Sequence, residues 1–94
     1  MKLTIEAKFH KDGKEETASV EIPFEDGTHT LPEVYPFSRR VNYVGPDAGY
    51  SLNWIGIDAG KRRITFGYNW IVDLDENGTA AYDSGSIFFL FRLE

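Results

Sequence analysis

Cysteine is absent from the 94 residues of this chain, so neither a disulfide nor a thiolate metal site can stabilise it. Long apolar runs are absent too, since none approaches the roughly 20 residues of a membrane span. The N-terminus alternates apolar and polar residues where a secretory signal would be continuously apolar. These absences predict a soluble protein that is stabilised by packing, is located in the cytoplasm and does not act at a membrane.

Basic residues are also scarce, because ten Lys and Arg are set against fifteen Asp and Glu, for a net charge of −5. This balance disfavours nucleic acid as a partner. His10 and His29 have no second ligand at metal spacing, and the serines lack the setting of a catalytic nucleophile. Acidic residues cluster at turns, where they stay solvated instead of acting as shifted acids or bases. The sequence therefore predicts no enzyme, no cofactor and no bound metal.

Turn signals are abundant. Four segments place a small or acidic residue and a glycine between β-like stretches, at residues 11–13, 25–27, 58–60 and 76–78. Sustained helical spacing of apolar residues is lacking. At this length the pattern predicts one all-β domain over residues 1–94. We expect a small antiparallel meander of six or seven strands, closing into a barrel or sandwich, with no long helix.

The register of the first hairpin follows from its loop length. A two-residue turn at 12–13 opposes Ile5 to Val20, so apolar residues share one face. A three-residue loop would oppose Ile5 to Ser19 instead. The Asp-Gly pair also favours the type I′ turn of a two-residue hairpin. Both features predict the same register.

Two further hairpins are expected on the same reasoning. A three-residue loop over 58–60 opposes Trp54 to Ile64 and leads into one long strand over 62–73, with alternate residues facing the core. A three-residue loop over 76–78 leads into a last strand. Its "DSGS" segment (83–86) is interpreted as a bulge.

The last strand contains "IFFLF", which is apolar on both sides, so Phe88 and Leu90 require a cover. The proline-rich segment 31–37, a second sheet, a second copy of the chain or a partner protein would each provide one. We expect a protein-binding surface here. Its residues are Ile55, Gly67, Phe88 and Leu90, with Asn53, Asn69 and Arg63 around them.

These observations favour a non-catalytic binding module that acts through a protein–protein surface, such as a small acidic inhibitor, adaptor or assembly subunit. Its partner would be another protein or a second copy of itself. The alternative is a small-ligand or carbohydrate-binding β-barrel, whose aromatic-lined pocket would use Trp70, Tyr43 and Trp54.

The segment "DLDENG", residues 73–78, begins as an EF-hand loop does, with oxygen-bearing side chains at alternate positions and then a glycine. The twelfth loop position, however, is Ser84 where a bidentate carboxylate is needed. Alternation with core residues also explains why Asp73 and Asp75 point outward. We interpret the segment as a hairpin turn, with weak calcium binding as the alternative.

Overall fold

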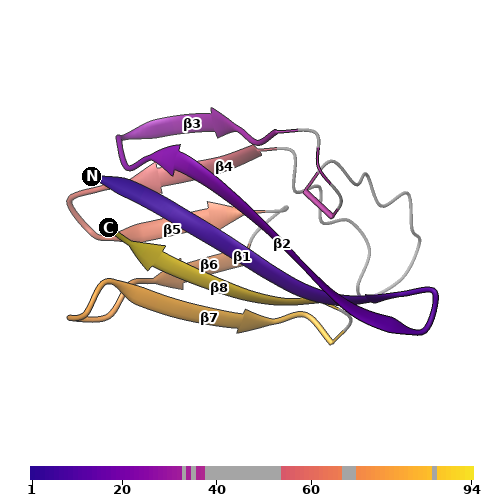
Figure 1. Cartoon of the computed structure of the whole chain (residues 1–94). Helices are drawn as coiled ribbons and strands as arrows, with labels where there is room; N and C mark the ends of the chain where they lie inside the picture. Colours follow the sequence, from indigo (N-terminus) through magenta and orange to yellow (C-terminus); the bar gives the residue numbers. More distant parts are fainter. Residues whose placement is uncertain (33, 35, 38–53, 67–69, 86) are drawn as a thin grey trace.

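Regular structure in the described part of the computed structural model is entirely β. The described residues are 1–32, 34, 36–37, 54–66, 70–85 and 87–94. They form two antiparallel sheets of four strands each, and this confirms the all-β prediction. Sheet A contains β1 (Lys2–Lys11), β2 (Lys14–Pro23), β7 (Thr79–Asp83) and β8 (Ile87–Leu93), in the order β2-β1-β8-β7 (Figure 1). Sheet B contains β3 (Gly27–Thr30), β4 (Trp54–Asp58), β5 (Arg63–Phe66) and β6 (Trp70–Asp73), in that order.

The topology departs from the expected meander in sheet A. Its central pair, β1 and β8, joins the two ends of the chain, where Lys2 and Glu94 exchange backbone hydrogen bonds of 2.9 and 2.8 Å. The described residues also contain eight strands where six or seven were expected. No helix in this described part of the chain is long and apolar enough to cross a membrane.

The first hairpin has the predicted register. Ile5 pairs with Val20, and the turn places Asp12 at φ 53° and Gly13 at φ 78°. A type I′ turn requires positive φ at both central positions, which aspartate tolerates and glycine adopts freely. Local turn chemistry and apolar alternation therefore specify this hairpin together.

The β4–β5 register differs from the prediction. Ile57, not Trp54, pairs with Ile64, because the loop has four residues, 59–62, instead of three. The shift is an odd number of residues, so it exchanges the two faces of β4. Ile55 and Ile57 therefore face the core, and Trp54 faces outward.

The expected long strand over 62–73 is two strands. β5 ends at Phe66 and β6 begins at Trp70, and the two pair antiparallel with Phe66 opposite Trp70. The predicted last strand is likewise divided. Tyr82 of β7 pairs with Phe89 of β8, so the segment interpreted as a bulge connects two paired strands.

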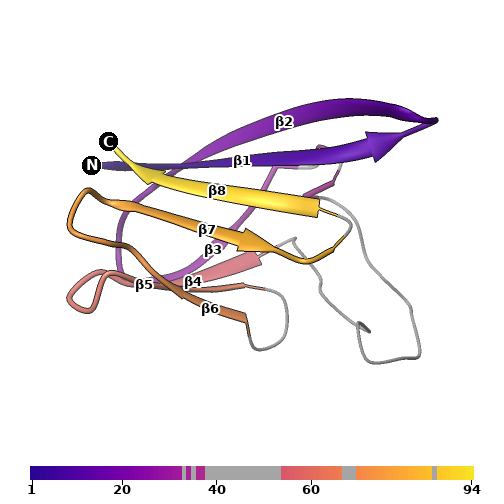
Figure 2. The same cartoon turned by 90° about the horizontal axis from the view of Figure 1, so that it is seen from below.

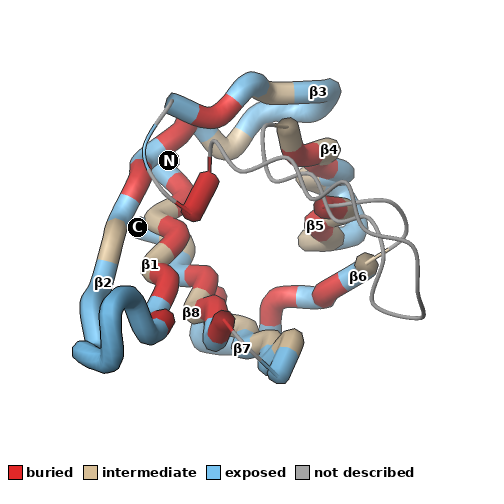
Figure 3. Tube along the Cα trace, turned by 90° about the vertical axis from the view of Figure 1, so that its right-hand side faces the viewer, coloured by how far each residue is buried: buried red, intermediate tan, exposed pale blue. Residues whose placement is uncertain are grey.

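The core lies between the two sheets, which form two layers (Figure 2). Figure 3 shows buried residues on strands of both sheets. Phe66 of sheet B links the layers, because its ring lies 5.3 Å from Tyr82, 5.6 Å from Phe89 and 5.2 Å from Phe91 of sheet A, between ring centroids. Such aromatic pairs add stabilisation beyond the burial of their surface.

Part of the segment that follows β3 and precedes β4 completes this core. Leu31, Pro36 and Phe37 are buried, and Leu31 and Phe37 line a void of only about 10 Å³ together with Phe89 and other core residues. They therefore fill the space between the sheets, on the opposite side of β8 from Phe88.

Candidate functional site

Phe88 and Leu90 stand on the outer face of β8, where the sequence placed them. Phe88 is 39% exposed and Leu90 is half-buried. The register puts Lys8 of β1 and Asp83 of β7 on either side of Phe88, and Glu6 beside Leu90. A small apolar centre thus lies among charged side chains, whose stems can pack along it.

A hollow of about 220 Å³, called the Phe88 hollow below, lies beside this centre. Phe88 forms part of its wall, and its ionisable lining residues are Lys8, His10, Glu15 and Asp83. The paired strands β1 and β2 extend beyond the end of β8 (Figure 1), which leaves this part of the sheet face open.

Hydrogen bonds hold the backbone at Ser84 and Gly85, which follow β7 and border the Phe88 hollow. Asp83 Oδ1 accepts from the Gly85 amide at 2.8 Å. Ser84 Oγ donates to the Ile87 carbonyl at 2.8 Å and accepts from the Ile87 amide at 3.0 Å. Gly85 has φ 93°, a conformation that favours glycine. This rim of the hollow is therefore held in place without a bound partner.

Sheet B carries a second hollow on its outer face, called the Gly56 hollow below. Ile55 and Ile57 point inward, so Trp54, Gly56 and Asp58 point outward along β4. A cavity of about 330 Å³ opens over Gly56. Its other lining residues are Gly27, Thr28, Ile57, Asp58, Arg63 and Thr65.

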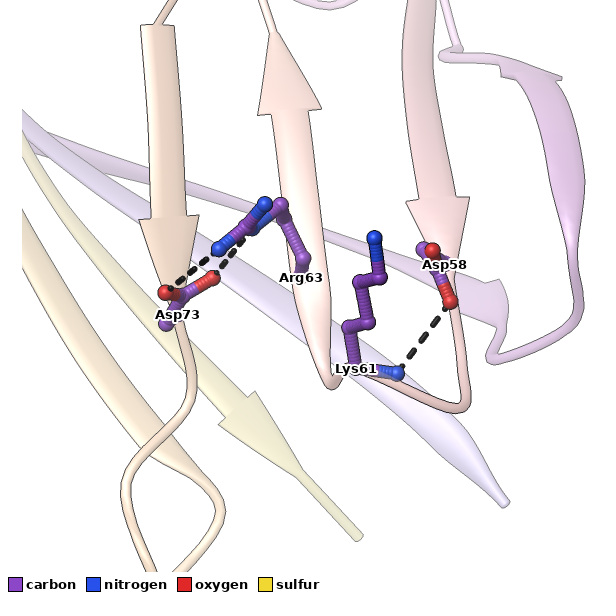
Figure 4. A network of polar contacts seen from close by, with 4 residues as sticks. All are labelled: Asp58, Lys61, Arg63 and Asp73. Carbon is purple, nitrogen blue, oxygen red and sulfur yellow. Dashed lines mark hydrogen bonds and ion pairs between the residues drawn. The ribbon is translucent and has the colours of Figure 1, made fainter.

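A row of charged residues crosses three strands (Figure 4), and two of them, Asp58 and Arg63, line the Gly56 hollow. Arg63 lies between Asp58 and Asp73 in the register. It donates to both carboxylate oxygens of Asp73, with Nε–Oδ1 at 2.8 Å and Nη2–Oδ2 at 3.2 Å. This fork lowers the pKa of Asp73 and raises that of Arg63, chiefly through the hydrogen bond between them, so both stay charged.

The predicted protein-binding residues do not form one surface. Phe88 and Leu90 lie on sheet A, Arg63 lies on sheet B, and Ile55 is a core residue with 1% exposure, unavailable to a partner. The remaining predicted residues, Gly67, Asn53 and Asn69, lie outside the described residues. The incorrect β4–β5 register is the reason Ile55 was placed on the outer face.

The three predicted ligand-binding aromatics separate as well. Trp70 packs against Phe66 and Tyr82, with ring centroids 5.4 and 4.6 Å away, and so belongs to the margin of the core. Trp54 faces outward beside Gly56, while Tyr43 lies outside the described residues. The described structure therefore shows no common pocket for Trp70 and Trp54.

The two aspartates of the segment 73–78 have separate roles, and the segment joins the two sheets instead of closing a hairpin. Asp73 pairs with Arg63. Asp75 accepts from the Asn77 and Thr79 amides and from the Thr79 hydroxyl, each at 2.9 Å. These bonds, led by that from the Thr79 amide, lower the pKa of Asp75. Among described residues no group of three or more His, Cys, Asp or Glu is arranged to hold a metal.

Sequence reasoning missed both hollows. The signal for the second was present in "WIGID", because a glycine inside a strand marks a place where a ligand or backbone can approach closely. The first depends on strand ends that only the correct register reveals. Comparison with known proteins adds no identity: no protein-family model, curated protein or solved structure matches this chain.

Proposed function

We propose that this chain is a non-catalytic binding module that acts through a protein–protein surface on the outer face of sheet A. The observation that carries the proposal is Phe88, an exposed aromatic on a regular strand, beside the Phe88 hollow and within a ring of charged residues. Its scaffold is inferred to be a β-sandwich, because two four-stranded sheets pack their apolar faces together.

The arrangement has the anatomy of a small interface. Interface energy concentrates in a few aromatic or Arg anchors surrounded by contacts that exclude water. Phe88 and Leu90 supply an apolar centre, and Lys8, Glu15 and Asp83 supply a rim of mixed charge. Mixed charge selects a partner by matched positions and not by long-range attraction. The partner is therefore another protein, or a second copy of the chain, with an apolar side chain that enters the Phe88 hollow.

A non-catalytic role fits the state of Asp73 and Asp75. Hydrogen bonds that hold local structure lower the pKa of both carboxyl groups. A general acid requires the opposite displacement, toward neutral pH. Both groups serve the scaffold.

The test replaces Phe88 with the photo-crosslinking residue benzoylphenylalanine. A matched chain carries the same group at Ile71, an exposed apolar strand position on the outer face of sheet B. Each protein is irradiated alone and then in an extract of its source cells. We expect crosslinks from position 88 to a second copy or to one protein, and far fewer from position 71.

Two substitutions complete the test. Phe88→Asp should abolish the partner complex, or the dimer measured by light scattering, whereas Ile71→Asp should leave it intact. Melting curves of both variants establish that they fold. Equal crosslinking from the two positions, or a complex that survives Phe88→Asp in a folded protein, would contradict the proposal.

A further inference from the structure

The outer face of sheet B has an opening that exists because one residue has no side chain. A Cβ built on Gly56 would meet only ordinary contacts, at 3.9 Å from the Thr65 carbonyl oxygen and 4.0 Å from both the Thr65 Cβ and the Trp54 Cζ3. Gly56 does not adopt a positive φ. Neither crowding nor backbone conformation therefore demands glycine here, and its effect is to leave space beside an indole ring.

The floor of the Gly56 hollow is flanked by hydroxyl groups. The register aligns Thr28 of β3, Gly56 of β4 and Thr65 of β5 in one row across the sheet. In the described part of the chain, neither threonine hydroxyl has a hydrogen-bonding partner in the protein. Each hydroxyl can donate one hydrogen bond and accept others. A polar ligand over Gly56 would find both kinds of partner on either side.

The charged edge adds donors and acceptors with fixed directions. Arg63 uses Nε and one Nη2 hydrogen on Asp73, so its remaining guanidinium hydrogens are available to a ligand. Asp58 uses Oδ1 to accept from the Lys61 amide at 3.1 Å and is exposed on the same row. The Arg63–Asp73 fork orients the guanidinium before any ligand arrives.

We propose that the Gly56 hollow is a binding site for one residue of a neutral saccharide. Trp54 does not line the hollow itself but borders it at Gly56, where its Cζ3 lies 4.0 Å from the Cβ position. The apolar C–H face of a pyranose would extend over Gly56 onto Trp54, and its hydroxyls would bond to Thr28, Thr65, Arg63 and Asp58. Aromatic surface beside a dense mixture of donors and acceptors suits a ring that is apolar on its faces and polar at its rim. An anion is disfavoured, because the charged row contains two carboxylates and one guanidinium.

The size of the opening agrees with such a ligand. A volume of about 330 Å³ is at the lower end of the range for small-molecule sites. The hollow lies open on a sheet face, so affinity for one sugar unit should be weak, in the millimolar range. The site lies on the opposite sheet from Phe88, so its failure and the failure of the protein-binding surface would be separate results.

The test is a titration of the ¹⁵N-labelled protein with neutral methyl glycosides of glucose, galactose, mannose, N-acetylglucosamine and xylose, observed by NMR. Trp54→Phe assigns the indole signals. We expect at least one sugar to give saturable shifts of the Trp54 indole N–H and of the Gly56 and Thr65 amides. The Phe88→Asp variant should respond as the unmodified chain does.

Gly56→Val is the decisive variant. Its Cβ fits and valine favours strands, so the sheet should persist while the methyl groups occupy the part of the hollow directly over residue 56. We expect binding to weaken at least about tenfold, which corresponds to about 1.4 kcal/mol. Ile71→Val, on the same face but outside the lining, should bind normally, and amide spectra establish the fold of both.

Three results would overturn the proposal. The first is a panel in which no sugar produces saturable shifts at these residues. The second is a response that a folded Gly56→Val protein retains in full. The third is a response at Arg63 to sodium phosphate or acetate in the absence of any response to sugars, which would make the hollow an anion site.

Discussion

Two neighbouring loops of this protein each contain one residue in the left-handed conformation, but the type of that residue differs between them. The β4–β5 loop, residues 59–62, and the β6–β7 loop, residues 74–78, each contain a glycine and one residue of positive φ. In the second loop that residue is Gly78, at φ 76°. In the first it is Arg62, at φ 52°, although Gly60 stands two positions away.

The loops are in direct contact, so their surroundings explain the difference. The Leu74 amide donates to the Arg62 carbonyl at 2.9 Å, and Arg62 Nη1 donates to the Asp75 carbonyl at 3.3 Å. These bonds hold Arg62 in the left-handed conformation. Gly78 is instead buried against Leu93, whose amide donates to the Gly78 carbonyl at 2.7 Å. Tertiary contacts, and not the position of a glycine, determine where the chain turns left-handed.

Gly78→Ala should give the largest effect. The new Cβ would lie 3.1 Å from the Leu93 Cβ, and alanine at this φ is strained. Strain of this kind costs about 1–3 kcal/mol, and each kcal/mol lowers the melting midpoint of such a domain by about 4–8 °C. Thermal unfolding followed by circular dichroism measures the loss. An unchanged melting midpoint would show that the Leu93 side chain moves aside without loss of stability.

Gly60→Ala is the matched substitution in the other loop, and its effect should have the opposite sign. Gly60 lacks a positive φ, and its Cβ would lie 3.6 Å from Asp58 Oδ1, an ordinary contact. Alanine should then stabilise the protein by about 0.4–1 kcal/mol by restricting the unfolded chain. A destabilisation comparable to that of Gly78→Ala, measured in the same way, would remove the distinction between the two loops.

Asp75→Asn tests the charge that holds the β6–β7 loop. Hydrogen bonds lower the pKa of Asp75 in the folded protein below its ordinary 3.8, so its ionised form stabilises the fold above that pH. The stabilisation is lost as pH falls through the lower, folded-state pKa. We expect the variant to melt below the unmodified protein at neutral pH and the difference to shrink below pH 3.8. If the difference between the two melting midpoints did not change with pH, the effect would come from the altered hydrogen-bonding groups of asparagine and not from the loss of the charge.

Calcium should have the smallest effect, because both aspartates of the segment 73–78 already direct their oxygens to protein donors. A ligand selective for the folded state raises the melting midpoint. We expect equal midpoints in calcium and in chelator. A higher midpoint in calcium, absent from Asp75→Asn, would instead establish a cation site in this loop.

The sequence was informative where local chemistry and alternation agree. The Asp12-Gly13 turn and the apolar face of β1 and β2 specify one register, and the structure has it. Inward Val72 and Leu74 were also predicted correctly. The β4–β5 register was wrong because Trp54 and Ile55 make both faces of β4 apolar. Alternation then cannot select between the two registers.

The missed strand breaks have a related cause. Phe66 and Trp70 are separated by an even number of positions, so the core residues of β5 and β6 keep one parity, as in a single strand. Between Tyr82 and Ile87 the parity changes, as it does at a bulge and also across some connections. The outward position of Phe88 was predictable, because in "IFFLF" both the odd-numbered and the even-numbered residues are apolar, so one set must face outward. The Gly56 hollow was missed, because the glycine of "WIGID" indicates an opening only when three strands are placed in the correct register.

The β1–β8 ladder, which pairs Leu3 with Leu93, has a consequence for how the chain folds. Contacts between residues so distant in sequence form slowly, because a long loop must close before any pairing compensates its entropy. The β1–β2 hairpin can form early, but one edge of β1 then stays unpaired until β8 is available. During that interval its apolar residues and backbone groups can pair with another chain. Closure of the two chain ends is therefore the step at which productive folding competes with aggregation.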